Sequence, residues 1–402
     1  MAWNSRDMES TPSPGENIAV LRKARSMGQA RLAREAGISV SYLSKIEVGL
    51  RPATPPVVAA VAKALHVQVQ RIYGQPFLGP SEQADLLHDL RAAVRRYTLP
   101  REDVPEPSAL QAAVRRAMQL RAETRYLELL GMLPKLLGQV TATALTSATG
   151  EAGAWTQVSD VYGCAYAVAH RLAQPDLADM IVSRQSWAAT QTWNPEAEVA
   201  AAWNEAGTYQ SAGQYEDGLA IVERAISKYQ TATPLGQSPE RAISLGSLHL
   251  RGVVLASRAK DPNATADHLH KAKVHAERIP QDVLAHNLTF GQENTALYEL
   301  AAHIELGKPN QAVEMSTPLL NQPPTSLTPN RLGRMYIDIA RARLDVKNYS
   351  GAEESLVKAF DVAPQMTEVH PMAREVLRVL FVLHQRARPQ LMGMAKRSGL
   401  TW

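Results

Sequence analysis

Cysteine is nearly absent from this sequence, since Cys164 is the only one among 402 residues. A single cysteine cannot form an intrachain disulfide, and a zinc site made of four thiolates is also excluded. We expect Cys164 to be a small, buried apolar residue on a helix.

Long apolar runs are missing too. Charged residues interrupt each run well short of the roughly 20 residues that a membrane-spanning helix needs. The opening stretch MAWNSRDMESTPSPGEN contains no apolar core of the kind found in signal peptides. We therefore expect a cytoplasmic protein that does not enter a membrane.

The motifs that carry common catalytic chemistry are missing as well. The sequence contains no P-loop, no GxSxG, no HExxH and no GxGxxG after a strand. Its richest histidine stretch, HLHKAKVH, holds His268, His270 and His275. Only His268 and His275 would share a helix face, two turns apart and too far for one metal ion. The stretch predicts a solvated helix surface, and we expect no enzyme activity, no metal site and no cofactor.

Positive charge is concentrated at one end of the chain, although the formal net charge is only +4. Residues 1–75 contain ten lysines and arginines against five acidic residues, a net charge of +5, and the other 327 residues carry −1. A basic module on a nearly neutral body is typical of a polyanion-binding unit joined to a second unit.

Proline, glycine and serine divide the first part of the chain into segments. Residues 1–14 predict a disordered tail, and residues 15–75, here called the head, contain five short helices separated by glycines and prolines. Residues 76–107 predict a linker that contains a connecting helix. Three prolines between that helix and residue 108 break the chain again. The head helices are marked by apolar residues that include Ile18, Leu32, Leu43, Val61 and Ile72.

Residues 108–402 predict a body made of helices alone, because alanine, leucine, glutamate and arginine dominate and no β-branched alternation occurs. Steps of 4, 3, 9, 4 and 3 residues recur in it, as in Ala202, Ala206, Tyr209, Gly218, Val222 and Ala225. Residues three and four apart share a helix face, and the small residue nine positions later lets a second helix pack closely against the first.

The small residues of this pattern mark the repeating units. Ala178, Gly218, Ala312 and Ala352 are separated by 40, 94 and 40 residues, and a degenerate unit from Leu248 to Ala272 fits the long interval. The spacing predicts five helical hairpins of about 40 residues that stack into a right-handed superhelix with a concave face. A helical cap at 108–149 precedes them.

The head and the body each resemble a known family. Residues 18–73, with QARLAREAGISVSYLSKIEVGLR at their centre, resemble the XRE/Cro-type helix-turn-helix, and the later spacing resembles tetratricopeptide repeats. The combination resembles bacterial XRE regulators with a tetratricopeptide-like sensor, a type common in high-GC bacteria and shared by peptide-responsive quorum-sensing regulators. It implies an all-α fold: a five-helix lambda-repressor-like DNA-binding domain at 15–75 and a tetratricopeptide-like α-solenoid at 108–402 for sensing and dimerisation.

The resemblance also assigns the residues that would read DNA. Val40, Ser41 and Lys45, in the first turns of the third helix, correspond to base-reading positions. Val40 suits a thymine methyl group, Ser41 can bond either type of base edge, and Lys45 suits guanine. Relatives often carry arginine or glutamine where Val40 stands, so direct reading at that position is weak. The alternative is that each is an ordinary solvated surface residue.

Three further residues correspond to phosphate contacts, namely Gln29, Ser39 and Arg51. Each of these also has an alternative interpretation as plain surface. Arg22 and Glu47 correspond to a semi-buried ion pair that ties the first helix of the head to the third, so we assign them to the fold.

The first helix of each hairpin should line the concave face with polar and aromatic side chains that bond an extended peptide. The alternative is ordinary lining or packing between repeats. Trp187, Trp193 and Trp203 lie close together in sequence and predict core residues. The effector-groove candidates are Asp160, His170, Arg171, Trp203, Gln210, Asn294, Tyr298, Glu305, Arg334, Asp338 and Arg341.

The combined resemblance implies a sequence-specific transcriptional regulator. It would bind double-stranded DNA at a near-palindromic operator as a homodimer, and its repeats would bind a peptide or small-molecule effector. The alternative is a repeat scaffold for peptides or proteins, in which DNA binding is incidental. Recovery of a discrete inverted repeat from genomic DNA favours the first, and unselective recovery at low salt favours the second.

Overall fold

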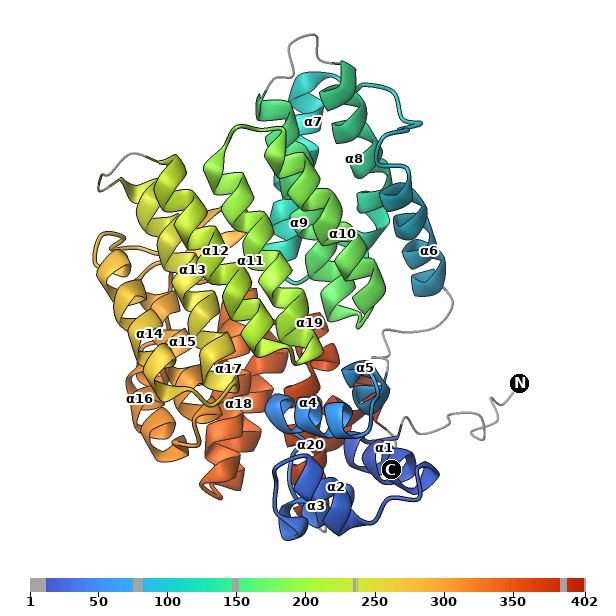
Figure 1. The fold of residues 1–402 in the computed structure, drawn as a ribbon, viewed down its shortest axis with the longest axis vertical. Helices are drawn as coiled ribbons and strands as arrows, with labels where there is room; N and C mark the ends of the chain where they lie inside the picture. The colour runs from blue at the N-terminus through green and yellow to red at the C-terminus, as the bar shows by residue number, and fades with distance from the viewer. Residues whose placement is uncertain are drawn as a thin grey trace. The chain divides into compact units, whose positions relative to one another are not determined.

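The computed structural model forms helices and one short β-hairpin (Figure 1). It divides into two compact units, one combining residues 1–78 with residues 333–402 and the other comprising residues 79–332. None of the described helices combines the length and apolar composition needed to cross a bilayer. The described residues are 12–74, 82–146, 152–233, 236, 238–383 and 389–400. The predicted tail therefore lies outside them, except for its last three residues.

The first unit contains the head and the C-terminal helices. The five head helices confirm the number predicted from the glycine and proline positions: α1 (Pro14–Ala24), α2 (Gln29–Glu35), α3 (Val40–Glu47), α4 (Pro55–Ala64) and α5 (Val69–Tyr73). The C-terminal helices are α17 (Pro329–Asp345, of which residues 333–345 belong to this unit), α18 (Tyr349–Val362), α19 (Pro364–Val369), α20 (Pro371–Leu383) and α21 (Pro389–Arg397).

Local signals start and separate the head helices. Ser13 and Glu16 form a reciprocal capping box at the start of α1, and Gly37 turns the chain between α2 and α3 at φ +66°. Gly15 lets α1 approach α3 closely, because a Cβ atom there would lie 2.1 Å from the carbonyl oxygen of Ile46. Any larger residue at Gly15 would force the two helices apart.

One apolar core joins the five head helices. Each helix contributes a side chain with no exposed surface, namely Ile18, Leu32, Leu43, Val61 and Ile72. Burying side chains of this size stabilises the fold by about 1.5–3 kcal/mol each. The core therefore fixes the orientation of α3, whose remaining side chains must point outward.

A semi-buried ion pair ties α1 to α3, as the sequence predicts. Arg22 Nε and Nη2 donate to the two carboxylate oxygens of Glu47 at 2.8 and 2.9 Å, and Arg22 Nη1 donates to the carbonyl oxygen of Met27 at 2.8 Å. Gln29 Nε2 also donates to Glu47 at 2.8 Å. Burial would raise the pKa of Glu47, but the hydrogen bonds from Arg22 and Gln29 hold it below its usual value.

The second unit is built from antiparallel helical hairpins, with α6 (Glu82–Arg95) as the predicted connecting helix and α7 (Pro107–Ala122) and α8 (Tyr126–Thr146) as the predicted cap. Helices α11, α12 and α13 lie side by side in Figure 1 and pack against one another. The others are α9 (Ala152–Arg171), α10 (Pro175–Thr190), α11 (Pro195–Ala212), α12 (Tyr215–Ala232), α13 (Pro239–Arg258), α14 (Pro262–Ala276), α15 (Gln292–Glu305) and α16 (Pro309–Asn321).

The five predicted hairpins coincide with helix pairs α9/α10, α11/α12, α13/α14, α15/α16 and α17/α18. The four small marker residues, Ala178, Gly218, Ala312 and Ala352, are all buried. Gly218 shows why a small residue is needed, because a Cβ atom there would lie 2.8 Å from a Leu255 methyl group on α13. The small residue sets the distance between neighbouring helices.

The prediction that no strand follows residue 108 is wrong. Strands β1 (Val283–Ala285) and β2 (Leu288–Phe290) form an antiparallel hairpin. His286 and Asn287 connect them with φ values of 44° and 64°, and two such residues suit the tight turns of β-hairpins. Phe290 is fully buried against Gly246 of α13, so the hairpin is held by a contact that no local pattern indicates.

The tryptophan prediction is wrong for Trp193, and Trp187 is only half-buried. Trp193 is 91% exposed, because it lies in the turn between α10 and α11 at φ 52° rather than on a helix face. Trp187 packs edge to face against Tyr97 and Trp155, with ring centroids 5.0 and 4.9 Å away. Trp203 is half-buried. Cys164 is buried, as expected.

The histidine stretch on α14 is not the solvated surface that its sequence predicts. His268 is only 4% exposed, and its Nδ1 lies 3.0 Å from Nδ1 of His249, a buried residue of α13. The ring of His275 stacks on His249 at 6.0 Å, whereas His270 is exposed. Gly252 makes room for this cluster, because a Cβ atom there would lie 2.6 Å from the His268 ring.

We predict that this cluster makes the protein less stable in mild acid. Burial, assisted by the charge of His268, lowers the pKa of His249 to about 3, so this ring stays neutral in the folded chain and gains a proton on unfolding below about pH 6.5. Unfolding then takes up protons, and the free energy of unfolding falls by about 1 kcal/mol between about pH 7.5 and 5.5.

The measurement is the unfolding midpoint of the full chain at both pH values. His249→Gln should make the midpoint less dependent on pH, whereas His270→Gln, which changes an exposed histidine of the same stretch, should leave the dependence unchanged. An identical pH dependence in the wild type and His249→Gln would contradict the prediction.

Candidate nucleic-acid interface

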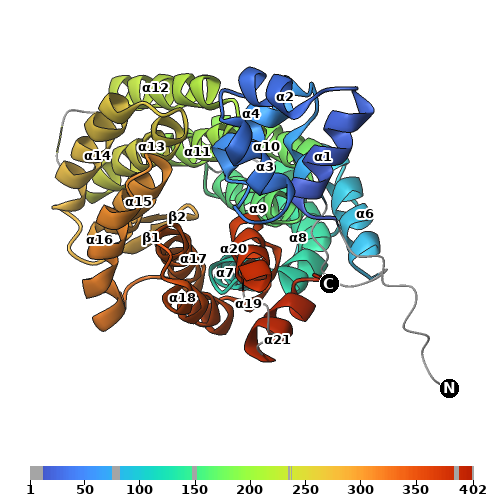
Figure 2. The same cartoon turned by 90° about the horizontal axis from the view of Figure 1, so that it is seen from below.

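Helix α3 presents the three predicted base-reading residues on one face. Leu43 and Ile46 are buried in the head core, and this anchors the opposite side of the helix. Val40 is 45% exposed, and Ser41 and Lys45 are also exposed. The side chains at the start of the helix are small and uncharged, so another molecule can approach its first turn closely. Helices α1, α2 and α4 group around α3 in Figure 2.

Ser39 begins α3. Its hydroxyl oxygen accepts a hydrogen bond from the backbone N–H of Tyr42 at 3.1 Å and thereby caps the helix. A serine hydroxyl that accepts in this way still carries a hydrogen to donate. Gln29, at the start of α2, uses one amide hydrogen on Glu47 and retains the other. Both residues therefore keep a donor beside the exposed face of α3.

Arg51, the third predicted phosphate residue, has a partner that the sequence does not indicate. Its Nη1 lies 3.7 Å from Oδ1 of Asp345 at the end of α17, and both side chains are more than one-third exposed. Close by, the buried backbone N–H of Ala53 donates to Glu375 of α20 at 2.9 Å. Acidic residues of the C-terminal helices thus contact the loop that follows α3.

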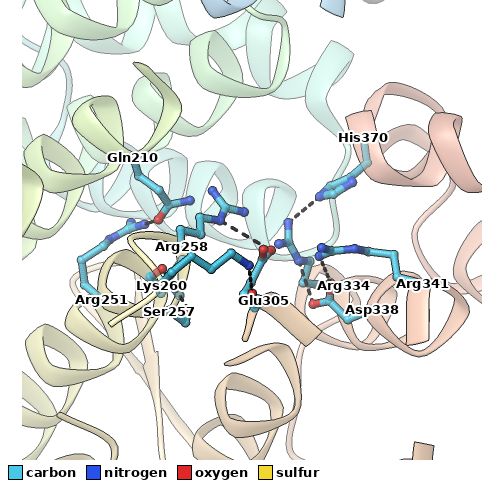
Figure 3. Close-up of polar contacts among 11 residues, drawn as sticks. Gln210, Arg251, Ser257, Arg258, Lys260, Glu305, Arg334, Asp338, Arg341 and His370 are labelled. Carbon is cyan, nitrogen blue, oxygen red and sulfur yellow. Dashed lines mark hydrogen bonds and ion pairs between the residues drawn. The ribbon is translucent and has the colours of Figure 1, made fainter. Parts of the chain in front are cut away.

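Several predicted groove residues of the second unit meet across α9, α11 and α13. Arg251 Nη1 donates to Gln210 Oε1 at 2.6 Å, as Figure 3 shows, and the Arg251 guanidinium lies 3.5 Å from the centre of the Trp203 ring. His170 Nδ1 lies 3.2 Å from the hydroxyl of Ser211. Sequence reasoning missed Arg251, because it lies in the degenerate hairpin where the repeat register is weakest.

Other predicted groove residues of this unit bond the β-hairpin region. Asp160 Oδ1 lies 3.2 Å from His286 Nδ1 in the turn between the strands. Asn294 donates to the carbonyl oxygen of Thr289 at 2.6 Å and accepts from Arg331 Nε at 2.7 Å.

The remaining candidates of the second unit lie near positive charges. The Tyr298 ring lies 4.8 Å from the guanidinium carbon of Arg331, and Glu305 Oε1 lies 3.6 Å from Arg258 Nε. Arg171 is half-buried at the end of α9.

Arg334, Asp338 and Arg341 form a separate cluster within the first unit. Asp338 is only 3% exposed. One of its carboxylate oxygens accepts a hydrogen bond from Arg334 Nε and the other accepts one from Arg341 Nη1, each at 3.1 Å. Arg334 also contacts His370, as Figure 3 shows. These three predicted groove residues therefore bond one another. Within the described part of the chain, no group of three or more histidine, cysteine or acidic residues is arranged to hold a metal ion.

Comparison with known proteins supports the assignment of the head. Residues 18–72 match a helix-turn-helix family model. An immunity repressor protein of Bacillus phage phi105 is 39% identical over 71 residues, which are 18% of this chain and 49% of the repressor. The chain therefore spans about half the length of that relative.

Two solved structures are similar over a larger part of the chain. PlcR of Bacillus thuringiensis, in complex with the peptide PapR7 and DNA, is 14% identical with a TM-score of 0.27, covering 67% of this chain and 96% of PlcR. ComR from S. thermophilus, in complex with DNA and its signalling peptide ComS, is 10% identical with a TM-score of 0.26, covering 88% and 93%. These TM-scores are too low to indicate a shared overall fold. The match of residues 18–72 and the repressor relative show that this chain carries a helix-turn-helix domain of the XRE type at its N-terminal end.

Proposed function

We propose that the protein is a sequence-specific DNA-binding transcriptional regulator that inserts α3 into the major groove. The observation that carries this proposal is the exposed face of Val40, Ser41 and Lys45 on a helix whose other face is held in the head core. The major groove admits one α-helix, and the first turns of a recognition helix meet the base edges.

Each of the three residues has a distinct role in reading bases. The methyl groups of Val40 contact a thymine methyl group, the Ser41 hydroxyl bonds either a donor or an acceptor, and the Lys45 ammonium group donates to guanine. The Val40 side chain has no polar atom and therefore forms no hydrogen bond with a base. Sequence preference at its position therefore rests on the apolar contact and on DNA shape.

Phosphate contacts set the register of the helix on the duplex. Ser39 at the N-terminus of α3 and Gln29 at the start of α2 donate hydrogen bonds to phosphates, and Arg51 adds a positive charge after the α3 C-terminus. With about 6–10 phosphate contacts per dimer, affinity falls on the order of 10³ to 10⁵ between about 50 and 200 mM salt. Fluorescence anisotropy with duplex DNA measures this slope, and an affinity independent of salt would contradict the proposal.

The rest of the chain dimerises the regulator and binds its effector. A homodimer places two α3 helices roughly 34 Å apart, which suits a near-palindromic operator. Polar and aromatic side chains meet between helices of the second unit, as Trp203, Gln210 and Arg251 do, and this supports a peptide or small-molecule effector there. A protein with this activity works in the compartment that holds DNA, in bacteria the cytoplasm.

We predict that Asp345 weakens DNA binding by competing for Arg51. Asp345→Asn should raise affinity for duplex DNA by up to about 5-fold, since an exposed ion pair contributes at most about 1 kcal/mol. Arg51→Ala should lower affinity and reduce the salt slope by about one. Asp361→Asn changes an exposed carboxylate on α18 and serves as the matched control. Anisotropy titrations that give the same affinity for all four proteins would contradict the role of Arg51.

A further inference from the structure

Five arginines gather within the second unit. They are Arg121 at the end of α7, Arg171 at the end of α9, Arg251 and Arg258 on α13, and Arg331 in the first turn of α17. Their charges act on one another: after burial, the charges of Arg258 and Arg331 lower the pKa of Arg251, and those of Arg171 and Arg331 lower the pKa of Arg121. We call these five residues the arginine cluster.

Three members of the cluster have a buried Nε that forms no hydrogen bond, although that of Arg258 lies 3.6 Å from Glu305 Oε1 in an ion pair. Among the described residues, Nε of Arg121, Arg251 and Arg258 has no hydrogen-bond partner although the atom is buried. Arg251 is only 7% exposed and Arg258 only 8% exposed. Native proteins pair almost all buried polar groups, and an unpaired buried charge is particularly unfavourable. Buried guanidinium donors of this kind are suited to an acceptor that does not come from the described residues.

Nearby carboxylates do not balance the cluster. Glu305 lies 3.6 Å from Arg258 Nε, and the backbone oxygen of Glu305 accepts from Lys260. Asp160 lies against His286 at 3.2 Å. Asp282 accepts from the backbone N–H groups of Glu293 and Asn294 at 3.2 and 2.7 Å and so caps α15. Glu305 pairs with Arg258, and Asp282 interacts electrostatically with Arg331. Three carboxylates against five arginines still leave an excess of positive charge.

Arg251 is held in a fixed orientation. The centre of the Trp203 ring lies 3.5 Å from the Arg251 guanidinium. Gln210 accepts from Arg251 Nη1 at 2.6 Å, a contact drawn in Figure 3. Gly207 lies between these two residues on the same face of α11. A Cβ atom at Gly207 would lie 3.1 Å from Arg251 Nη2 and 2.3 Å from the Tyr166 hydroxyl. The glycine therefore admits both side chains, and the guanidinium is oriented before any ligand arrives.

We propose that the arginine cluster binds an oxyanion, a carboxylate or a phosphate, and that this group belongs to the effector. The guanidinium fork matches both kinds of oxyanion and forms charge-assisted hydrogen bonds with them. The anion accepts from Arg251 Nε, which has neither a hydrogen-bond partner nor a carboxylate beside it among the described residues, and offsets the repulsion among the five positive charges. The identification of the ligand as the effector rests on the proposed function, whereas the binding of an oxyanion does not.

Thermal unfolding of the full chain without DNA tests the inference with three probes. These are inorganic phosphate, a mixed hexapeptide library with a free C-terminal carboxylate, and the same library with an amidated C-terminus. We expect a phosphate or free-carboxylate probe to raise the unfolding midpoint by about 2–4 °C at saturation. A rise with phosphate alone indicates a phosphate group, and a rise with the free but not the amidated library indicates a carboxylate.

Two variants and one control locate the effect. Arg251→Met and Arg258→Met should each remove the rise. Arg251→Met should lower the midpoint without ligand by no more than a few degrees, because Arg251 forms no ion pair with a carboxylate among the described residues. Arg258→Met should lower it further, because this change leaves the buried carboxylate of Glu305 without the arginine. Arg115→Met removes an exposed arginine on α7 and should keep the rise. Either variant alone is sufficient if the other does not fold.

Two results would overturn the inference. One is that no probe raises the midpoint of the wild-type protein, and the other is that the folded variants keep the full rise. Duplex DNA binding is measured on the same preparations. If DNA binds while no anion does, the inference fails and the proposed function stands. If an anion binds while DNA does not, the proposed function fails instead.

Discussion

Replacing Ser41 and Lys45 together with alanine is expected to lower affinity for the operator by at least about 100-fold, while non-specific DNA binding changes by less than about 10-fold. Each good base contact contributes about 1–3 kcal/mol of discrimination, and the double variant removes two of the three base-reading side chains. Both side chains are exposed on α3, so the head core around Leu43 and Ile46 stays intact.

Fluorescence anisotropy measures the affinity for two duplexes at one salt concentration. One is the operator, obtained by selecting genomic DNA fragments with the wild-type protein, and the other is a scrambled version of it. Lys63→Ala, which removes an exposed charge from α4, is the control for the loss of one positive charge. It should weaken both duplexes slightly and equally. If the double variant still distinguishes the operator from the scrambled duplex as the wild type does, α3 does not read the bases.

Glu47→Ala is expected to destabilise the head by about 3 kcal/mol or more. Its carboxylate accepts from Arg22 twice and from Gln29 once, and only 6% of its side chain is exposed. Removing one partner of a buried ion pair leaves the other charge buried without compensation, which generally costs about 3–5 kcal/mol. A head of this size has little stability to spare, so a large fraction of it would unfold at moderate temperature.

Glu35→Ala provides the matched control, because Glu35 pairs with Arg31 on the surface of the same domain. The Arg31 side chain is 60% exposed, and such a pair contributes about 0–1 kcal/mol. Circular dichroism or amide hydrogen exchange of the head residues measures both changes. Equal losses in the two variants would show that the Arg22–Glu47 pair is no more important than a surface pair.

Much of the helical architecture could be predicted because its signals are local. Apolar residues three and four apart predict a helix face, and Gly28, Gly37 and Gly49 separate the head helices. The small residues of the repeats predict where a second helix packs, and Gly218 of α12 shows the contact, because a Cβ atom there would lie 3.3 Å from the Cβ atom of Tyr209 on α11. These patterns depend on neighbours within one or two turns of the same hairpin.

Features held by distant residues could not be predicted. Ala53 and Glu375 are 322 positions apart, and no local pattern relates them. The β-hairpin at 283–290 depends on the burial of Phe290 against α13. The sequence suggests a solvated stretch at His268, because the partner that buries it, His249, lies on another helix.

The candidate sites differ in the same way, since one depends on local sequence and the other on contacts between distant residues. The exposed face of α3 follows from the helix-turn-helix resemblance residue by residue, since that motif is contiguous. The predicted effector groove depends on the repeat register, and there the sequence selects Gln210 and Trp203 but misses Arg251, which contacts both. It also cannot indicate that Arg334 and Arg341 share the carboxylate of Asp338.

Selection of genomic DNA fragments by the purified full-length protein, followed by sequencing, tests the central claim most directly. The account predicts enrichment of a discrete inverted repeat whose half-site centres lie about one helical turn of DNA, or a multiple of it, apart. That enrichment should disappear with Ser41→Ala and Lys45→Ala. Recovery of fragments without a common motif, or of the same motif by the double variant, would contradict the claim that α3 reads DNA sequence.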